Sequence, residues 1–501
     1  MSFGAQDEVV AYLSSLDGGA SGVVSTHISI VVLGRTRAFK LKREVVFPYL
    51  DFSTPQKRLA MCEREVALNR RAAPTLYLGA RRITREADGA LAFEGAGGLV
   101  DAVVEMRKFD EDALFDRLAA AGRLTKEMIE ALAQAIAAFH DAAEVDCGRG
   151  GLAGMARVVE LSAKSSREAP LADAPALDER AARLEDALRL NGALLEARRA
   201  QGKIRRCHGD LTLRNICLLD GAPTLFDCLE FSDELATIDV LYDLAFPLMD
   251  LWRANERGLA NLALNRYLDL SDETDGLPLL PLFMSLRAMI RAHVNAAQEK
   301  RIDARAYFDL AGELLRAPAP RVIAIGGLSG SGKSSVAARL APHVGAAPGA
   351  RVVNSDRLRK QMCGVAPTAR LPQEAYASEV SARVYARLFD EARRVAASRW
   401  PVIVDAVFDR REDRDAIGRI ARELDVPFQG YWLDAGLEQR AARVDARRND
   451  VSDATREVLM RQLEQETGAI RWTRIDAARH VQAIVEDIQS RMELNPPPAA
   501  C

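Results

Sequence analysis

The stretch "RRCHGDLTLRNICLLDGAPTLFDCLEF", residues 205–231, decides how the first half of this 501-residue chain is interpreted. It places Asn215 five positions after Asp210, and its second apolar run, "TLF", leads into Asp227. A loop that transfers phosphoryl groups needs a carboxylate beside the acceptor hydroxyl and an amide oxygen for a metal ion. A short strand that ends in a metal-binding acid then completes the pattern. The spacing of these three residues meets all of these needs.

The whole chain has the composition of a soluble globular protein, with 49% hydrophobic and 28% charged residues. Its length is too great for one core, so two or three domains are expected. The opening segment "MSFGAQDEVVAYLSSL" lacks the basic and apolar regions of a signal peptide. We expect no membrane span, and seven scattered cysteines without a C-x-x-C pattern indicate reduced thiols. These features predict a cytoplasmic protein.

Two prolines in "RAPAPRV", residues 316–322, mark the predicted domain boundary. We predict a first domain over 1–317, with a small strand-rich lobe to about residue 107 and a helical lobe from about 108. Strands and helices alternate over 318–495, which favours a parallel sheet flanked by helices. Residues 496–501, "PPPAAC", are expected to be a flexible tail.

The second domain opens with "GGLSGSGKSS", a complete phosphate-binding loop between the apolar strand "RVIAIG" and the helical "SVAARLAPHV". Its glycines allow successive main-chain N–H groups to face a phosphate at a helix N-terminus. Lys333 is expected to reach the β- and γ-phosphates of ATP, and Ser334 to bind Mg²⁺. The predicted nucleotide-binding residues are Gly327, Ser329, Gly330, Ser331, Gly332, Lys333, Ser334 and Ser335.

Two further acids end apolar runs in this domain, Asp356 in "VVNSDRLRK" and Asp405 in "VIVDAVF". Groups at the carboxyl ends of parallel strands line the ligand crevice, so both are expected to face Lys333. Asp405 has the form of a carboxylate that supports Mg²⁺. A helical stripe with Arg440, Arg443 and Arg447 comes later, before a loop that is long enough to close over ATP.

This second half resembles the small P-loop kinases of the polynucleotide-kinase, zeta-toxin and gluconate-kinase type. The resemblance implies Asp356 as the base that accepts the proton of a substrate hydroxyl. It implies Arg359 as a substrate anchor, and Arg443 and Arg447 as lid arginines that assist catalysis.

The opening stretch, with Asp243 in "YDLAF", resembles the aminoglycoside phosphotransferase family, a branch of the bilobal protein-kinase-like fold. The resemblance covers roughly residues 20–315. It implies Asp210 as catalytic base and Asn215 and Asp227 as Mg²⁺ ligands, with His208 shaping the loop and Asp243 in a structural role. Glu230 is close enough to add a carboxylate near the same metal, and we assign it to the substrate side.

The small lobe is expected to supply a lysine for the α- and β-phosphates and a helical glutamate that holds it. Lys40 and Lys42 in "AFKLKR" lie on one face of a strand, and both remain candidates, with Lys40 preferred. Glu65 is the preferred partner, before Glu63. The segment "VVEMRKF", residues 103–109, is expected to be the hinge, where the backbone of Glu105 and Met106 meets adenine. The G-x-G-x-x-G loop of many kinases is absent from this lobe.

The tandem order resembles bacterial proteins described as aminoglycoside-phosphotransferase-like domains fused to a P-loop kinase-like ATPase. We therefore expect two Mg·ATP-dependent sites that phosphorylate hydroxyl groups of small molecules, which are sugar-, nucleoside- or aminoglycoside-like. The alternative is a single catalytic domain that is regulated by the other as a nucleotide sensor. A nucleic-acid substrate is not expected, because residues 321–495 hold 28 basic against only 24 acidic residues.

Overall fold

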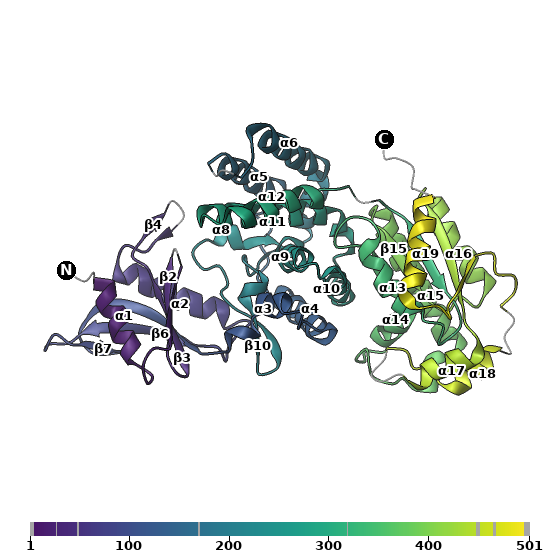
Figure 1. Cartoon of the computed structure of the whole chain (residues 1–501), viewed down its shortest axis with the longest axis horizontal. Coiled ribbons are helices and arrows are strands. Elements are labelled where there is room, and N and C mark those ends of the chain that lie inside the picture. Colours follow the sequence, from purple (N-terminus) through teal and green to yellow (C-terminus); the bar gives the residue numbers. More distant parts are fainter. Residues whose placement is uncertain are drawn as a thin grey trace. The chain divides into compact units, whose positions relative to one another are not determined.

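The computed structural model describes residues 5–26, 28–47, 50–168, 171–317, 319–446, 451–463 and 467–494 (Figure 1). The chain forms two compact units. The first comprises Met1–Leu161 and Leu188–Ala254, and the second comprises Ser162–Ala187 and Asn255–Cys501. We call them the N-terminal and C-terminal units. Their boundaries are discontinuous in sequence, and the division at residue 318 remains a proposal.

An antiparallel sheet in the order β1-β2-β3-β8-β6-β7 begins the N-terminal unit. Helix α2 packs on β8 and β6. Thr54 caps this helix by accepting a hydrogen bond from the N–H of Lys57, and a proline occupies its first turn. The elements are α1 (Ala5–Ser15), β1 (Gly22–Ser25), β2 (Ser29–Leu33), β3 (Arg37–Lys42), β4 (Val46–Phe47), β5 (Leu50–Asp51), α2 (Pro55–Asn69), β6 (Tyr77–Arg85), β7 (Leu91–Phe93) and β8 (Gly98–Arg107).

The remainder of this unit is mainly helical and includes two short antiparallel strand pairs, β10-β11 and β12-β9. The β10-β11 hairpin lies between Asn215 and Asp227, so it brings the ends of the opening motif together. The elements are η1 (Glu111–Ala113), α3 (Phe115–Ala120), α4 (Lys126–Asp141), α5 (Gly151–Glu168), which begins in this unit and ends in the other, α7 (Gly192–Ala200), β9 (Ile204–Arg206), η2 (Leu213–Asn215), β10 (Ile216–Leu219), β11 (Ala222–Leu225), α8 (Asp233–Ala236), β12 (Thr237–Asp239) and α9 (Val240–Arg253).

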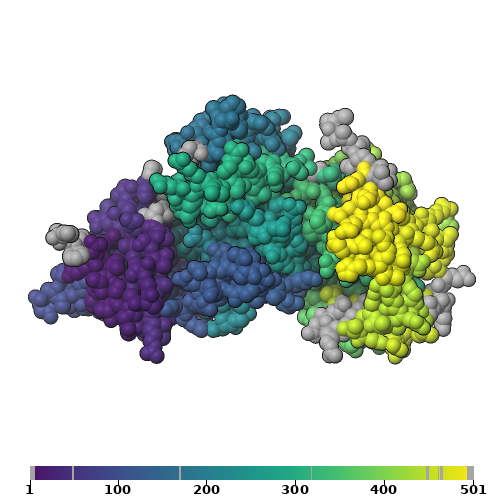
Figure 2. Space-filling view, viewed as in Figure 1, coloured from purple at the N-terminus to yellow at the C-terminus, as the bar shows by residue number. Residues whose placement is uncertain are grey.

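The C-terminal unit contains a parallel sheet in the order β14-β15-β13-β16-β17, which confirms the predicted sheet. All five residues of the central strand β13 are buried, as expected for a parallel strand that is covered on both faces. Helices α13 and α19 pack together and share an apolar core with the strands, and α15 packs against α16. In Figure 2, α19 lies in yellow on the face turned toward the viewer.

Helices that precede the sheet in sequence also belong to this unit. The elements are α6 (Ala174–Leu190), which begins in this unit, α10 (Arg257–Leu270), η3 (Thr274–Leu279), α11 (Leu280–Ala297), α12 (Arg301–Leu314), β13 (Val322–Gly326), α13 (Lys333–Leu340), η4 (Ala341–His343), β14 (Arg351–Asn354), α14 (Ser355–Met362), η5 (Gln373–Tyr376), α15 (Ser378–Ala397), β15 (Val402–Asp405), α16 (Arg411–Glu423), β16 (Phe428–Asp434), α17 (Leu437–Asp445), α18 (Arg456–Leu463), β17 (Thr473–Asp476) and α19 (Val481–Leu494).

One helical stretch among the described residues, Thr274–Ala297, is long and apolar enough to cross a membrane by composition alone. In its most apolar window, 72% of the residues are buried inside the protein. Such burial is typical of a core helix in a globular unit, so the stretch is weak evidence for a membrane span.

Candidate functional site

Two lysines of β3 converge on one carboxylate of α2. The Nζ atom of Lys40 lies 2.8 Å from Oε1 of Glu65, and Lys42 forms an ion pair with Oε2 of the same residue. The side chain of Glu65 is fully buried, whereas Glu63 is exposed. The two lysines share one strand face because side chains alternate along a strand. The glutamate preferred from the sequence thus contacts both candidate lysines.

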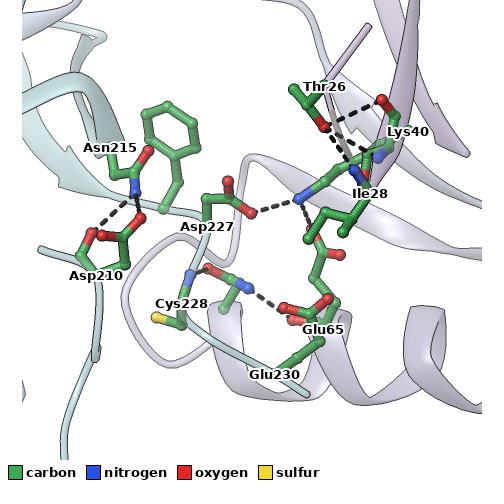
Figure 3. Close-up of polar contacts among 12 residues, drawn as sticks. Thr26, Ile28, Lys40, Glu65, Asp210, Asn215, Asp227, Cys228 and Glu230 are labelled. Carbon is green, nitrogen blue, oxygen red and sulfur yellow. Dashed lines mark hydrogen bonds and ion pairs between the residues drawn. The ribbon is translucent and has the colours of Figure 1, made fainter. Parts of the chain in front are cut away.

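Each lysine also has a second acidic partner from the segment that follows β11. Lys40 pairs with Asp227, and Lys42 pairs with Glu230, as Figure 3 shows for the first of these pairs. The side chain of Lys42 is wholly buried, but that of Asp227 is 39% exposed. The Lys40–Asp227 end of this network is therefore the end that a ligand can reach.

The carboxylates keep this network charged. Burial opposes the charge of Lys40, but Asp227 and Glu65 raise the pKa of its ammonium well above the usual value. Burial likewise opposes the charge of Lys42, and Glu230 and Glu65 together raise its pKa. For Asp227, burial works against ionisation, yet Lys40 holds the pKa of this carboxyl below its usual range. All three groups are consequently ionised at neutral pH.

The loop with Asp210 is fixed by hydrogen bonds from both of its ends. The Nδ2 atom of Asn215 donates to Oδ2 and to the main-chain oxygen of Asp210, at 2.9 and 2.8 Å (Figure 3). Asp243 accepts bonds from the main-chain N–H groups of His208 and Gly209, at 3.0 and 2.9 Å. These contacts hold the Asp210 carboxylate on a braced main chain.

His140, Cys207 and Asp243 form a buried group whose potential ligand atoms lie within 4.8 Å of one another. Both carboxylate oxygens of Asp243 already accept N–H groups of the loop, and His140 Nε2 lies 3.1 Å from one of them. The hydrogen bonds explain this cluster as a brace beneath the Asp210 loop.

The donors near Asp227 fit a hard divalent cation. Because Asn215 donates through its amide nitrogen to Asp210, its amide oxygen is the atom left for a metal. The carboxylate of Asp227 adds oxygen donors of the kind that Mg²⁺ prefers. Asp227 has a left-handed backbone, with φ of 64°, and its N–H donates to the hydroxyl of Tyr77 at 3.0 Å. Residues without glycine's freedom rarely adopt this conformation, so the bond to Tyr77 helps to hold the acid in place.

Three other predicted residues have partners inside the protein. Glu230 is buried beside Lys42. Glu105 and Met106 lie within β8, which pairs with β3 on one side and β6 on the other. The carboxylate of Glu105 binds Arg37 and Arg81, and Met106 belongs to an apolar cluster with Ala38 and Tyr77.

The sequence reasoning missed an apolar pair beside this network. Phe109 follows β8, and Phe226 directly precedes Asp227; their rings meet edge to face with centroids 5.3 Å apart. Both pack against the cluster that contains Ala38 and Met106. Phe226 ends the apolar run "TLF", and the sequence around it gives no sign of the contact with Phe109.

The C-terminal unit presents the phosphate-binding loop between β13 and α13. Gly327, Gly330 and Gly332 all have positive φ, at 142°, 80° and 94°. A Cβ atom on Gly330 would lie 2.6 Å from the main-chain oxygen of Arg440, so only glycine fits there. Lys333 is the first residue of α13, and its Nζ atom donates to the carbonyl of Leu328 at 3.3 Å.

Ser334 and Asp405 are linked by a residue that the sequence reasoning missed, Asn354. Its Nδ2 atom donates to Oδ2 of Asp405 at 2.6 Å and to the hydroxyl of Ser334 at 3.4 Å. Its Oδ1 atom caps α14 by accepting the N–H of Arg357. Burial raises the pKa of Asp405, and Lys333 opposes that shift. The hydroxyl and carboxylate oxygens form a donor set that fits Mg²⁺.

A cavity of about 1720 Å³ extends from the phosphate-binding loop. Its walls include Lys333, Ser334, Asp405 and Asp356, so the structure brings these predicted residues to one space. Further residues around the cavity are Ser329, Gly330, Ser331, Gly332, Ser335, Arg359, Tyr376, Tyr385, Phe389, Asp409, Arg410, Asp413 and Arg443.

The predicted arginines have different surroundings. Arg359 donates to the carbonyl of Ala375 at 2.7 Å, and its guanidinium lies over the ring of Tyr376. Arg443 donates to the carbonyl of Ser331 at 3.1 Å, which places it against the phosphate-binding loop. Arg447 lies outside the described residues. One loop N–H, that of Ser329, donates to Oε1 of Gln462 at 2.9 Å.

Comparisons with known proteins match both halves. The model of the phosphotransferase enzyme family matches residues 59–279, and the model of an AAA domain matches residues 322–467. The chain is also 30% identical over 478 residues to the uncharacterized protein Rv2004c of Mycobacterium tuberculosis, covering 91% of this chain and 92% of the relative. An uncharacterized protein of Mycobacterium bovis matches with the same identity and coverage.

Solved structures resemble one half or the other. A gluconokinase from Sinorhizobium meliloti is 24% identical, covers 35% of this chain and 93% of its own, and has a TM-score of 0.26. A choline/ethanolamine kinase family protein from Mesorhizobium loti is 14% identical, with coverage of 63% and 96% and a TM-score of 0.39. Aminoglycoside 2'-phosphotransferase-IIIa is 14% identical, with coverage of 62% and 97% and a TM-score of 0.36.

Proposed function

Since the chain belongs to the family of these mycobacterial proteins and joins a phosphotransferase domain to a P-loop kinase-like domain, we propose that it is an ATP-dependent phosphotransferase with two nucleotide sites. Each site would transfer the γ-phosphoryl group of Mg·ATP to a hydroxyl group of a small molecule. The observation that supports the proposal is that each half of the chain brings together a lysine, oxygen donors that fit a divalent cation and an aspartate that is a candidate base.

In the N-terminal unit, Lys40 would bind the α- and β-phosphates while Glu65 holds its ammonium in position. A Mg²⁺ ion held by Asn215 and Asp227 would neutralise charge on the phosphates. Asp210 would accept the proton of the acceptor hydroxyl at its carboxylate. The bond from Asn215 to Oδ2 leaves Oδ1 of Asp210 for that contact. Lys42 and Glu230 would brace the network from its buried side.

In the C-terminal unit, the main-chain N–H groups of the glycine loop and Lys333 would bind the triphosphate. Ser334 and Asp405 would hold Mg²⁺, with Asn354 orienting both. Asp356 would accept the proton of the acceptor hydroxyl, and Arg443 would approach the phosphates from α17. The cavity exceeds the range of about 300–1,000 Å³ that is usual for small-molecule pockets, which supports simultaneous binding of nucleotide and acceptor.

The proposed acceptors are small hydroxyl compounds of sugar-, nucleoside- or aminoglycoside-like chemistry. We propose that the protein phosphorylates them in the cytoplasm. The net charge of −3 gives no support to a nucleic-acid partner. We also propose that the protein does not associate with membranes.

The second candidate function makes one unit a nucleotide sensor for the other. One observation favours it for the N-terminal unit. Lys40 is already paired with Asp227, the proposed metal ligand, so phosphate and metal would compete with this pair for the two side chains. Such a rearrangement is typical of a site that responds to its ligand.

The experiment is an ATP-consumption screen over sugars, nucleosides and aminoglycosides with the wild type, Asp210→Ala and Lys333→Ala. For two enzymes, each variant abolishes one activity and retains the other. A sensor instead binds two equivalents of a non-hydrolysable ATP analogue per chain, and only one variant loses turnover. If an ATP-dependent activity is found and neither substitution changes it, the assignment of both sites fails.

A further inference from the structure

Strand β14 lies at the edge of the parallel sheet, and a helix supplies hydrogen-bond partners to its outer side. Asn265 of α10 accepts the N–H of Val352 at 2.7 Å and donates to the carbonyl of Ala350 at 3.2 Å. These are hydrogen bonds that a neighbouring strand would otherwise make. One side-chain amide thus replaces part of a strand ladder along β14.

A second asparagine and an ion pair extend this contact. Asn261 donates to the carbonyls of Pro348 and Ala350, at 3.1 and 3.0 Å. Arg351 pairs with Asp269 at 2.7 Å and donates to the main-chain oxygen of Asn265 at 3.0 Å. The side chains of both asparagines and of Arg351 are almost completely buried. Buried polar groups are costly unless they are paired, so this geometry is strongly specified.

The same segment of chain also forms hydrogen bonds with two helices that flank the sheet. At α14, Gln361 donates to the main-chain oxygen of Asp269 at 2.7 Å. At α15, Glu391 accepts the hydroxyl of Thr274 at 3.0 Å. Residues 257–275, which we call the anchor segment, therefore contact β14, α14 and α15.

Those three elements carry one side of the candidate P-loop site. β14 ends at Asn354, which bonds to Asp405 and Ser334. α14 carries Asp356 and Arg359, and α15 carries Tyr385, all on the wall of the cavity. The anchor segment itself lies within the phosphotransferase match and ends well before the AAA match begins at residue 322.

We propose that Asn265 and Asp269 are positioning residues for the P-loop site, so that part of the phosphotransferase-matched chain completes the metal and acceptor side of the second site. This inference rests on the proposed nucleotide-binding function of the P-loop. Asn265 acts through β14 on Asn354, and Asp269 acts through Arg351 and α14 on Asp356. Helix α10 also contacts α13, but the hydrogen bonds of Asn265 and Asp269 described above reach β14 and α14 and not the glycine loop. We therefore expect main-chain phosphate binding to persist when these two side chains are changed.

The test uses the full chain with Asn265→Ala and, as a second change, Asp269→Asn. Binding of a non-hydrolysable ATP analogue is titrated with and without Mg²⁺, and the P-loop event is identified by its loss in Lys333→Ala. We expect the gain in affinity due to Mg²⁺ to fall about tenfold, as for other residues that orient metal ligands. Affinity without Mg²⁺ stays within about twofold of the wild type, because the loop amides are unchanged.

Hydrogen exchange provides a second readout that needs no ligand. Amides of residues 352–362 exchange faster in both variants, while those of β16 and β17, at the opposite side of the sheet from β14, keep their wild-type protection. Asp309→Asn is the control, because Asp309 lies on α12 of the same unit in an exposed pair with Arg305. The control should match the wild type in both measurements.

Wild-type Mg²⁺ dependence and wild-type exchange in Asn265→Ala and Asp269→Asn would overturn the proposal. An equal shift in Asp309→Asn would also overturn it, because the effect would then be general. If Lys333→Ala abolishes neither nucleotide-binding event, the proposed P-loop function fails instead, and the exchange experiment still decides whether the anchor segment holds β14 and α14.

Discussion

Lys40 Nζ lies 2.8 Å from Oε1 of Glu65, and the other oxygen of this carboxylate binds Lys42. One buried acid thus compensates two cations. Glu65→Gln leaves both lysines with one acidic partner fewer, and breaking a buried ion pair costs about 3–5 kcal/mol. We expect a loss of that order in the free energy of unfolding, measured by chemical denaturation.

Glu63→Gln is the matched control, because Glu63 lies on the same helix and is exposed. It should change the free energy of unfolding by no more than about 0.5 kcal/mol. Equal losses in the two variants would show that the buried network does not depend on Glu65.

The Lys42–Glu230 pair predicts a non-additive double substitution. Lys42→Met alone leaves the buried carboxylate of Glu230 without its cation and should cost about 3 kcal/mol. Adding Glu230→Gln removes the stranded charge, so the double variant should be more stable than the sum of the two single variants implies. Thermal and denaturant unfolding of all four proteins complete the cycle, and strict additivity would contradict a direct pairing.

Asp413 predicts a pH dependence in the C-terminal unit. Burial raises the pKa of this carboxyl to about 6, and Arg410 only partly offsets the shift. Because the folded-state pKa of Asp413 lies above its unfolded value, the contribution of this group to the free energy of unfolding is largest below about pH 4. That contribution is lost as the pH rises through 6. Asp413→Asn removes that loss and should add about 1 to 2 kcal/mol at pH 8, after allowance for partial exposure.

At pH 3 the same substitution should have little effect, since the carboxyl is then mostly protonated in both the folded and the unfolded state. Asp415→Asn serves as the control, because Asp415 lies on the same helix in an exposed pair with Arg411. A stabilisation by Asp413→Asn that is equal at both pH values would rule out the titration of Asp413 as its cause.

The side-chain oxygen of Gln462 accepts a hydrogen bond from a main-chain N–H of the phosphate-binding loop, that of Ser329. A phosphate oxygen must displace this amide oxygen, and a hydrogen bond of this kind contributes about 1 kcal/mol. We therefore expect Gln462→Ala to raise nucleotide affinity at the P-loop about fivefold in equilibrium titration. Gln439→Ala, at a half-buried glutamine of α17 that donates to the carbonyl of Ala478, should leave the affinity unchanged. An unchanged or weaker affinity in Gln462→Ala would mean that Gln462 does not compete with phosphate.

The features that could be predicted from the sequence are those written in contiguous residues. The glycine loop at 327–332 needs only its own backbone conformation and its neighbouring strand and helix, so its place between β13 and α13 was predicted. The parallel sheet followed from the alternation of apolar strands and helices. Asp210 and Asn215 were found together because five positions of one loop separate them.

Contacts between distant segments left no such pattern. The strand "AFKLKR" offered two lysines on one face, and only the fold shows that Glu65 binds both. The closeness of Glu230 to Asp227 in sequence suggests the substrate side, but it gives no sign of the pairing of Glu230 with Lys42. Asn354 was missed because an asparagine before a helix is sufficiently explained as a cap. The hairpin β6-β7 and the hydroxyl of Tyr77 were also missed.

The asparagine contacts along β14 also bear on how such proteins can be inherited. A recombination event at the prolines near residue 320 would exchange the P-loop sheet but not the helix that borders its edge strand. The exchanged sheet would then have an edge strand with unsatisfied hydrogen-bonding groups, unless the new chain also had asparagines equivalent to Asn261 and Asn265. Positions 261, 265, 269 and 351 should therefore vary together among relatives. The two halves of the chain should also have been inherited together rather than exchanged separately.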